Sequence, residues 1–183
     1  VNVRAVERQA LLAECKAPVR FYGKGSESVL WSENEILYED GTAGFDLCDA
    51  FSRTTVRLRI QGFHQIENTL AAALVGRLLG MPPAEIVEGL QGYQGTWGRM
   101  QREELPDGSL LIEDLYNSNP VSMQAALDFL AHFQNRRRVA VLGEMWDLGE
   151  QSEHWHRVVG RQISGKHVDV LIAVGPLAQG FIE

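Results

Sequence analysis

Apolar residues in the second half of the chain alternate between two spacings. Short, nearly continuous apolar runs predict strands at Leu110–Glu113, Arg138–Leu142 and Val168–Val174. Between them, helical spacing predicts helices at Val121–Phe133 and Ser152–Ile163. Uninterrupted apolar runs suit parallel strands that helices cover on both faces. This half therefore predicts an α/β fold with a mainly parallel sheet.

The first half shows a β-rich section between helical patterns. A helix is expected at the start, where Val3, Val6 and Ala10 keep helical spacing before Lys16–Pro18 closes it. The expected strands are Val19–Tyr22, Ser28–Trp31, Glu35–Glu39 and Thr54–Ile60. Two helices follow, the first after His64 with Ile66, Leu70, Ala73, Leu74 and Leu78 inward, the second from Pro82–Pro83 with Ile86, Val87 and Leu90 inward.

A glycine-rich segment separates the two halves. Residues Gly92–Arg99 keep neither the helical nor the strand period. We interpret this segment as a linker, which predicts two domains, residues 1–97 and 98–183.

Composition narrows the class of protein. The 183 residues carry a net charge of −7, which disfavours a nucleic-acid surface, and no apolar run is long enough to span a membrane. The two cysteines form no disulfide framework, so a cytoplasmic setting is expected. The chain begins without methionine and stops at Phe181–Glu183 in an apparent helix start, so we expect it to be part of a longer protein.

The stretch Leu111–Pro120 is the first candidate for a ligand site. A short apolar run passes into acid, phenol and amide groups, and Asn119 before Pro120 predicts a helix N-cap. The loop where a strand meets a helix N-terminus often binds ligands in α/β folds. A well-capped turn without a ligand explains the same residues.

Two other segments contain incomplete motifs for phosphate binding and for metal binding. Gly160–His167 nearly matches a phosphate loop, but it ends in His167 instead of a hydroxyl residue and runs from helix to strand. His154 and His156 are two apart on a helix and diverge, so no metal site is predicted.

Four segments, in order, resemble the Mur ligase superfamily. Gly62-Phe63-His64-Gln65-Ile66-Glu67-Asn68 resembles its G-x-H-N-x-x-N signature, and Gly98-Arg99 stands at the family's junction of central and C-terminal domains. Two further runs resemble one branch, Glu113-Asp114-Leu115-Tyr116-Asn117-Ser118-Asn119-Pro120 and Val141-Leu142-Gly143-Glu144-Met145-Trp146-Asp147-Leu148-Gly149-Glu150. The resemblance implies the distal part of a central ATPase domain followed by part of a Rossmann-like C-terminal domain.

The resemblance also implies a reaction. This branch uses ATP and Mg2+ to convert the carboxylate of UDP-N-acetylmuramoyl-tripeptide to an acyl phosphate, which the amine of D-alanyl-D-alanine attacks. The full-length protein would be a cytoplasmic monomer of peptidoglycan synthesis. The implied ATP-binding residues are His64, Gln65, Asn68, Arg99 and Asp114, and the implied substrate-binding residues are Tyr116, Asn117 and Asn119.

The chain departs from the family in ways that bear on activity. Gln65 stands where asparagine is usual, and Glu113 where aspartate is common. The phosphate loop, the Mg2+ ligands and the modified lysine of the family have no counterpart here, so the chain alone is expected to be inactive, with sheet edges and apolar surface exposed. Another amide ligase of the superfamily, such as a folylpolyglutamate-synthase-like enzyme, and a non-catalytic interaction module remain as alternatives.

Overall fold

The computed structural model describes residues 1–182 and divides the chain into two compact units, Val1–Gly95 and Thr96–Glu183. The division falls between Gly95 and Thr96, inside the glycine-rich segment that the sequence singled out as a linker. Each unit has its own buried apolar clusters. The units are therefore described separately.

The first unit is built on a four-stranded sheet with strand order β1-β2-β3-β4. The strands β2, β3 and β4 pair antiparallel, whereas the short β1 runs parallel to β2. Their bounds are Phe21–Tyr22, Ser28–Leu37, Thr42–Cys48 and Arg53–Gln61. The two expected pieces Ser28–Trp31 and Glu35–Glu39 thus belong largely to one long strand, β2.

Strand β3 was missed by the sequence analysis. Its residues Thr42, Ala43, Gly44 and Phe45 are all buried, so they show no alternation of apolar and polar positions. Gly44 lies under the ring of Tyr38, where an added Cβ would come within 2.8 Å of ring atoms. A small residue is needed for this close packing, and it hides the strand pattern.

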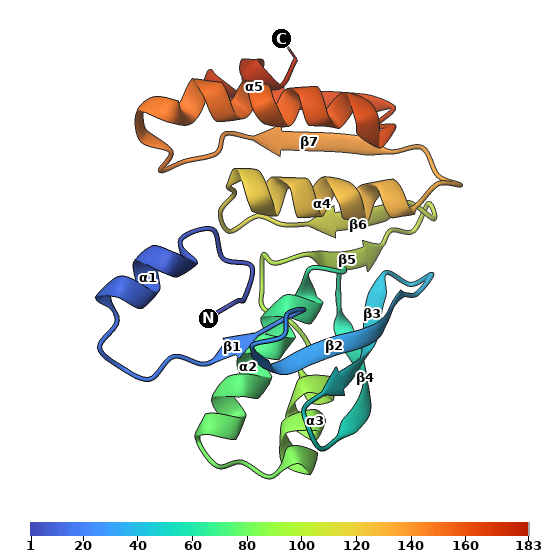
Figure 1. Cartoon of the computed structure of the whole chain (residues 1–183). Coiled ribbons are helices and arrows are strands. Elements are labelled where there is room, and N and C mark those ends of the chain that lie inside the picture. The colour runs from blue at the N-terminus through green and yellow to red at the C-terminus, as the bar shows by residue number, and fades with distance from the viewer. Residues whose placement is uncertain (183) are drawn as a thin grey trace. The chain divides into compact units, whose positions relative to one another are not determined.

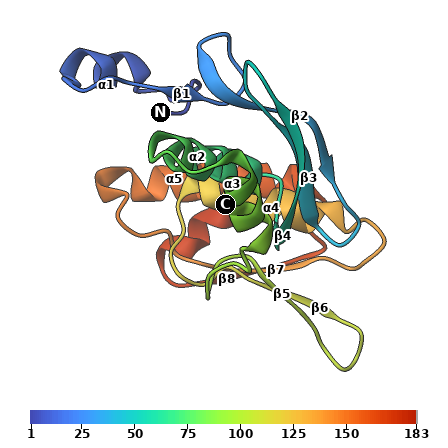
Figure 2. The ribbon, with the colours of Figure 1, turned by 90° about the horizontal axis from the view of Figure 1, so that it is seen from below.

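Helices α2 (Gln65–Leu78) and α3 (Pro83–Gly92) pack against this sheet. Figure 2 shows the long strands β2 to β4 curving past both helices. Ile66 and Leu70 of α2 join Phe45, Val56 and Leu58 of the sheet in one buried cluster. Leu78 was expected to face inward, but its side chain is 65% exposed because it lies in the last turn of α2.

The expected N-terminal helix is displaced along the chain. Helix α1 spans Arg8–Glu14, and none of its residues is buried. Val3 instead lies beside β1, where its N–H donates to the carbonyl of Tyr22 at 2.9 Å and its side chain covers Gly25. The spacing of Val3, Val6 and Ala10 therefore marks no helix face, and Val6 is 93% exposed.

The second unit contains two two-stranded sheets, and Figure 1 labels strands β5, β6 and β7 of them. Strands β5 (Gln101–Glu104) and β6 (Leu110–Glu113) pair antiparallel, and β7 (Val139–Gly143) and β8 (Val170–Val174) pair parallel. The helices are α4 (Pro120–His132), α5 (Ser152–Ile163) and the 3-10 helices η1 (Gly149–Gln151), η2 (Ser164–Lys166) and η3 (Leu177–Phe181). The predicted strands and helices of this half lie within two residues of these bounds, whereas β5 and the three 3-10 helices were not predicted. A helix expected to start at Phe181–Glu183 extends outside the described residues.

Within the described residues, helices cover only one face of the β7–β8 sheet. Ala140 of β7 packs with Met123 and Leu127 of α4 and with Val159 of α5. On the opposite face, Val141 is 63% exposed. The expectation of helices on both faces is therefore wrong for the residues described, in which α4 and α5 pack beside each other on the same side.

Asp49 connects the β3–β4 turn to the C-terminal end of α2. Its carboxylate accepts the N–H groups of Phe51 and Ser52 and pairs with Arg77. Burial raises the pKa of Asp49, but these hydrogen bonds and the ion pair outweigh it and lower the pKa to about 2. Since the folded pKa is depressed, this group stabilises the first unit above its ordinary pKa of about 4.

We predict that the Asp49 contribution disappears as the pH falls from about 4 to about 2. Asp49→Asn keeps the oxygen that accepts from the turn but loses the charge. It should lower the unfolding free energy of the first unit by about 2 kcal/mol at neutral pH and by much less at pH 2, as measured by urea unfolding. Asp107→Asn is the control: it removes a charge from an exposed turn of the second unit, so it should leave the unfolding free energy of the first unit unchanged. Equal losses at both pH values would contradict the prediction.

Candidate functional site

The loop after β6, residues Asp114–Asn119, is held by the carbonyl of Gly98. This oxygen accepts the N–H of Leu115 at 2.9 Å and the N–H of Tyr116 at 3.2 Å. Gly98 itself donates its N–H to Gln101 Oε1 at 2.9 Å and has a φ of +69°. A left-handed φ favours glycine, which explains why this residue type stands at the end of the linker.

Arg99, the residue after Gly98, is thereby placed beside this loop. Its guanidinium lies 4.4 Å from the centroid of the Tyr116 ring, within the range of a cation–π interaction. Both side chains are exposed to solvent, and Asp114, two residues before Tyr116, is partly buried at the end of β6. The structure therefore brings together three of the residues that the sequence predicted for ligand binding.

Asn119 caps α4. Its Oδ1 accepts the N–H groups of Val121 at 3.0 Å and Ser122 at 2.9 Å, and the Ser122 hydroxyl accepts the N–H of Asn119 in return. This reciprocal pattern is a capping box. The side-chain oxygen of Asn119 thus holds the start of the helix. Asn117 is exposed, and its Oδ1 accepts the N–H of its neighbour Ser118.

The loop after β7 is fixed by a buried histidine. His156 of α5 accepts the N–H of Met145 at its Nε2, at 2.9 Å, and its Nδ1 lies 2.6 Å from the carbonyl of Ser152. Because a carbonyl only accepts, the proton must be on Nδ1, and the ring is neutral. Phe181 stacks on the ring at a centroid distance of 5.0 Å. The sequence analysis gave His156 no function, and this position is structural.

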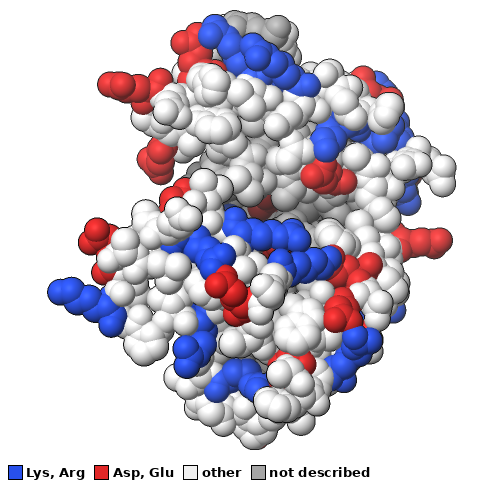
Figure 3. Space-filling model, in the orientation of Figure 1, with Lys and Arg blue, Asp and Glu red and all other residues white. Residues whose placement is uncertain are grey.

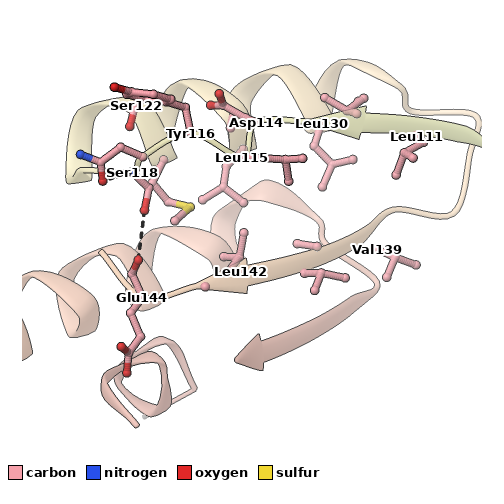
Figure 4. Close-up of a pocket in the computed structure, with 18 of the residues that line it drawn as sticks. Leu111, Asp114, Leu115, Tyr116, Ser118, Ser122, Leu130, Val139, Leu142 and Glu144 are labelled. Atoms are coloured by element: carbon pink, nitrogen blue, oxygen red, sulfur yellow. Dashed lines mark hydrogen bonds between the residues drawn. The ribbon is translucent and has the colours of Figure 1, made fainter. Parts of the chain in front are cut away.

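A cavity of about 790 Å³ lies within the second unit (Figure 4). Apolar side chains of β6, α4 and β7, among them Leu111, Leu130 and Leu142, line most of its length. Among residues 1–182, strand β6 pairs only with β5 and β7 only with β8, so the cavity follows two strand edges that are not bonded to each other. Polar groups lie at its other end, where the strands finish, and include Asp114, Tyr116, Asn117, Glu144 and Asp147.

The remaining predicted residues lie in the first unit, at the start of α2. His64 precedes the helix, and its ring covers Gly62, whose φ is +97°. An added Cβ at Gly62 would come within 2.6 Å of the His64 ring, so glycine is required for this turn. Asn68 donates from Nδ2 to Gln65 Oε1 at 2.9 Å. The two amides therefore form a pair on the first turn of the helix, where Gln65 is partly buried and Asn68 is exposed.

The charged side chains and the metal-ligating side chains give little further information about what the site binds. On the face that Figure 3 shows, basic side chains lie in short groups beside acidic ones. Among residues 1–182, no group of three or more His, Cys, Asp or Glu side chains could hold a metal ion. The same residues contain no helix with the length and hydropathy of a membrane span.

Comparison with known proteins gives one consistent result. Residues 98–181 match the family described as Mur ligase, glutamate ligase domain. The UDP-N-acetylmuramoyl-tripeptide--D-alanyl-D-alanine ligase of Bacillus subtilis is 32% identical over 163 residues, which cover 88% of this chain and 35% of that protein. The chain thus spans about a third of the length of this curated relative.

Solved structures agree. The crystal structure of MurF from Acinetobacter baumannii superposes with a TM-score of 0.90 at 29% identity, covering 100% of this chain and 40% of that one. The MurF ligase of Thermotoga maritima, solved in complex with ADP, gives a TM-score of 0.79 at 26% identity, covering 94% of this chain and 40% of that one.

We predict that Asn119 and Asn117 differ in their effect on stability. Asn119→Ala removes the cap of α4 and should lower the unfolding free energy by about 1 kcal/mol. Asn119→Ser keeps a capping oxygen and should recover most of the loss. Asn117→Ala should change it by less than about 0.5 kcal/mol, since its side chain is exposed. Urea unfolding of the three variants measures this, and equal losses for Asn119→Ala and Asn117→Ala would contradict the assigned cap.

Proposed function

Because the chain belongs to the Mur ligase superfamily, we propose that it is part of an ATP-dependent ligase of peptidoglycan precursor synthesis. The reaction would join D-alanyl-D-alanine to UDP-N-acetylmuramoyl-tripeptide, as the name of the Bacillus subtilis relative states for that enzyme. The observation that carries the proposal is that Arg99, from the segment before β5, lies over Tyr116 of the loop that also carries Asp114. Residues 1–97 would be the distal part of the ATPase domain, and 98–183 the first part of the C-terminal domain.

The proposed reaction has two steps. A carboxylate oxygen of the tripeptide attacks the γ-phosphorus of ATP, and ADP leaves, which gives an acyl phosphate. The amine of D-alanyl-D-alanine then attacks the acyl carbon, and the tetrahedral intermediate loses phosphate and a proton to give the amide. Such a site must neutralise phosphate charge, align the two substrates and exclude water. We place this reaction in the cytoplasm.

The described residues would supply part of these requirements. Arg99 presents a planar fork of N–H donors that suits phosphate oxygens. Asp114 would accept hydrogen bonds from ribose hydroxyls, and the paired amides of Gln65 and Asn68 offer both a donor and an acceptor to adenine. His64 would shape the turn that presents these amides. Tyr116 and Asn117, both exposed on the loop, would face the incoming dipeptide, and Asn119 would hold the helix behind them.

Mg2+ has no ligand set among the described residues. The superfamily uses it to neutralise the phosphates of ATP, but residues 1–182 contain no cluster of metal ligands. We therefore assign no step to the ion and no ligand for it in this chain. The sequence has no phosphate-loop pattern, so we propose that the chain alone has no turnover.

We predict that the chain restores activity in the context of a whole ligase. A chimera would carry these 183 residues in place of the matching segment of the Bacillus subtilis relative. It should release phosphate from ATP only when the UDP-linked tripeptide and D-alanyl-D-alanine are both present, whereas the isolated chain should release none. Arg99→Ala in the chimera should abolish most of this release, because an unpaired phosphate charge remains. A folded chimera that releases phosphate independently of the dipeptide would contradict the proposed reaction.

We also predict that the Tyr116 ring supports nucleotide binding through Arg99. A cation–π contact at an exposed site is worth about 0.5–1 kcal/mol, so Tyr116→Leu should raise the KM for ATP about two- to fivefold. Tyr116→Phe keeps the aromatic face and should leave this KM nearly unchanged. Steady-state kinetics of the chimera at varied ATP measure both. A larger loss in Tyr116→Phe than in Tyr116→Leu would show that the hydroxyl, not the ring, is the important group.

A further inference from the structure

Glu144 lies at the centre of three loops in the second unit. It follows β7 directly, and its side chain reaches the loop after β8, where Oε1 accepts the N–H of Leu177 at 2.7 Å. Its main-chain carbonyl accepts the hydroxyl of Ser118, in the loop after β6, at 3.3 Å. In Figure 4 the Glu144 side chain points away from Ser118, so one residue contacts both neighbouring loops from opposite ends.

The fit around the carboxylate is close. Gly175, between β8 and Leu177, has a φ of +110°, and an added Cβ there would come within 2.6 Å of the Glu144 carboxyl carbon. Glycine at this position therefore leaves the space that the carboxylate occupies. The next residue, Met145, is fully buried and is bonded through its N–H to His156. The main chain at Glu144 is thus anchored on its other side by the core.

We propose that Glu144 is a positioning residue that fixes the Asp114–Asn119 loop relative to the loops after β7 and β8. The carboxylate binds a backbone N–H of its own unit and would not contact a ligand directly. It holds the β7 loop in the one place where its carbonyl meets Ser118. The inference concerns loop geometry, and its consequence for catalysis rests on the proposed function, since Asp114, Tyr116 and Asn117 are the residues positioned.

The alternative is that Glu144 acts through its charge, for instance on a ligand cation or amine. Glutamine separates the two roles, because Glu144→Gln keeps a side-chain oxygen that can accept from Leu177 but has no charge. Glu144→Ala loses both. A matched control is Glu153→Ala, which removes the same charge from the exposed face of α5, where Glu153 pairs with Arg157.

Amide hydrogen exchange of the 183-residue chain tests the proposal without any ligand. Glu144→Ala should accelerate exchange at the Leu177 amide and also at the amides of residues 115–118, by about tenfold for the loss of one hydrogen bond. Glu144→Gln and Glu153→Ala should exchange like the unsubstituted chain at these positions. Amides within α5 should not change in Glu144→Ala or Glu144→Gln, which shows that the second unit stays folded.

Ser118→Ala provides a second, independent variant. It removes only the hydroxyl that donates to Glu144, so it should accelerate exchange at residues 115–118 and leave the Leu177 amide unchanged. Two results would overturn the proposal: unchanged exchange at residues 115–118 in Glu144→Ala, or equal acceleration in Glu144→Gln and Glu144→Ala. Because no nucleotide or dipeptide is added, the outcome is decided even if the proposed ligase reaction fails.

Discussion

Two backbone N–H groups, those of Leu115 and Tyr116, converge on the carbonyl of Gly98. This small constraint determines most of the candidate site, because it places Arg99, the last residue of the linker, next to the loop after β6. Arg99 then lies over the Tyr116 ring. Asp114 follows β6 directly, and β6 pairs with β5. The first residue of β5 is Gln101, whose side chain accepts the N–H of Gly98. A turn, a strand pair and a glycine with a left-handed φ thus organise one cation, one carboxylate and one phenol.

The sequence predicted those parts of the fold in which apolar spacing alone determines the element. Helix α5 was predicted with its observed bounds, and Asn119 was recognised as the N-cap of α4. Strands were missed where burial does not alternate along the chain or where the strand is polar. Strand β3 is buried on both sides and contains Gly44 and Ala43, so its pattern has no period. Strand β5, Gln101–Glu104, is polar and mostly exposed, and only its pairing with β6 makes it a strand.

The same reasoning explains which site residues could be predicted. Arg99, Asp114 and Tyr116 were found by resemblance, and their proximity could not have been derived from spacing, because it depends on the hydrogen bonds of Gly98. Glu144 was quoted only as part of a motif. Its contacts with Ser118 and Leu177 join residues 26 and 33 positions away in the chain, and no local pattern carries such information. The exposed face of β7 was likewise not predictable, since an apolar strand looks the same whether one face is covered or both.

The large cavity between β6 and β7 illustrates why volume is a poor guide to chemistry here. Much of its wall consists of apolar side chains, leucine above all, beside two strand edges that are not bonded to each other in the described residues. A nucleotide or a dipeptide would leave its charges unpaired in that apolar part, at a considerable cost in free energy. The polar end differs, because it combines Asp114 and Asn117 with Tyr116, over which Arg99 lies. Two other acids at this end, Glu144 and Asp147, would repel phosphate, but the Glu144 carboxylate points away from Ser118 and accepts the N–H of Leu177. Anchoring Glu144 to the backbone therefore positions the loop and also turns a negative charge away from the place where an anionic substrate would bind.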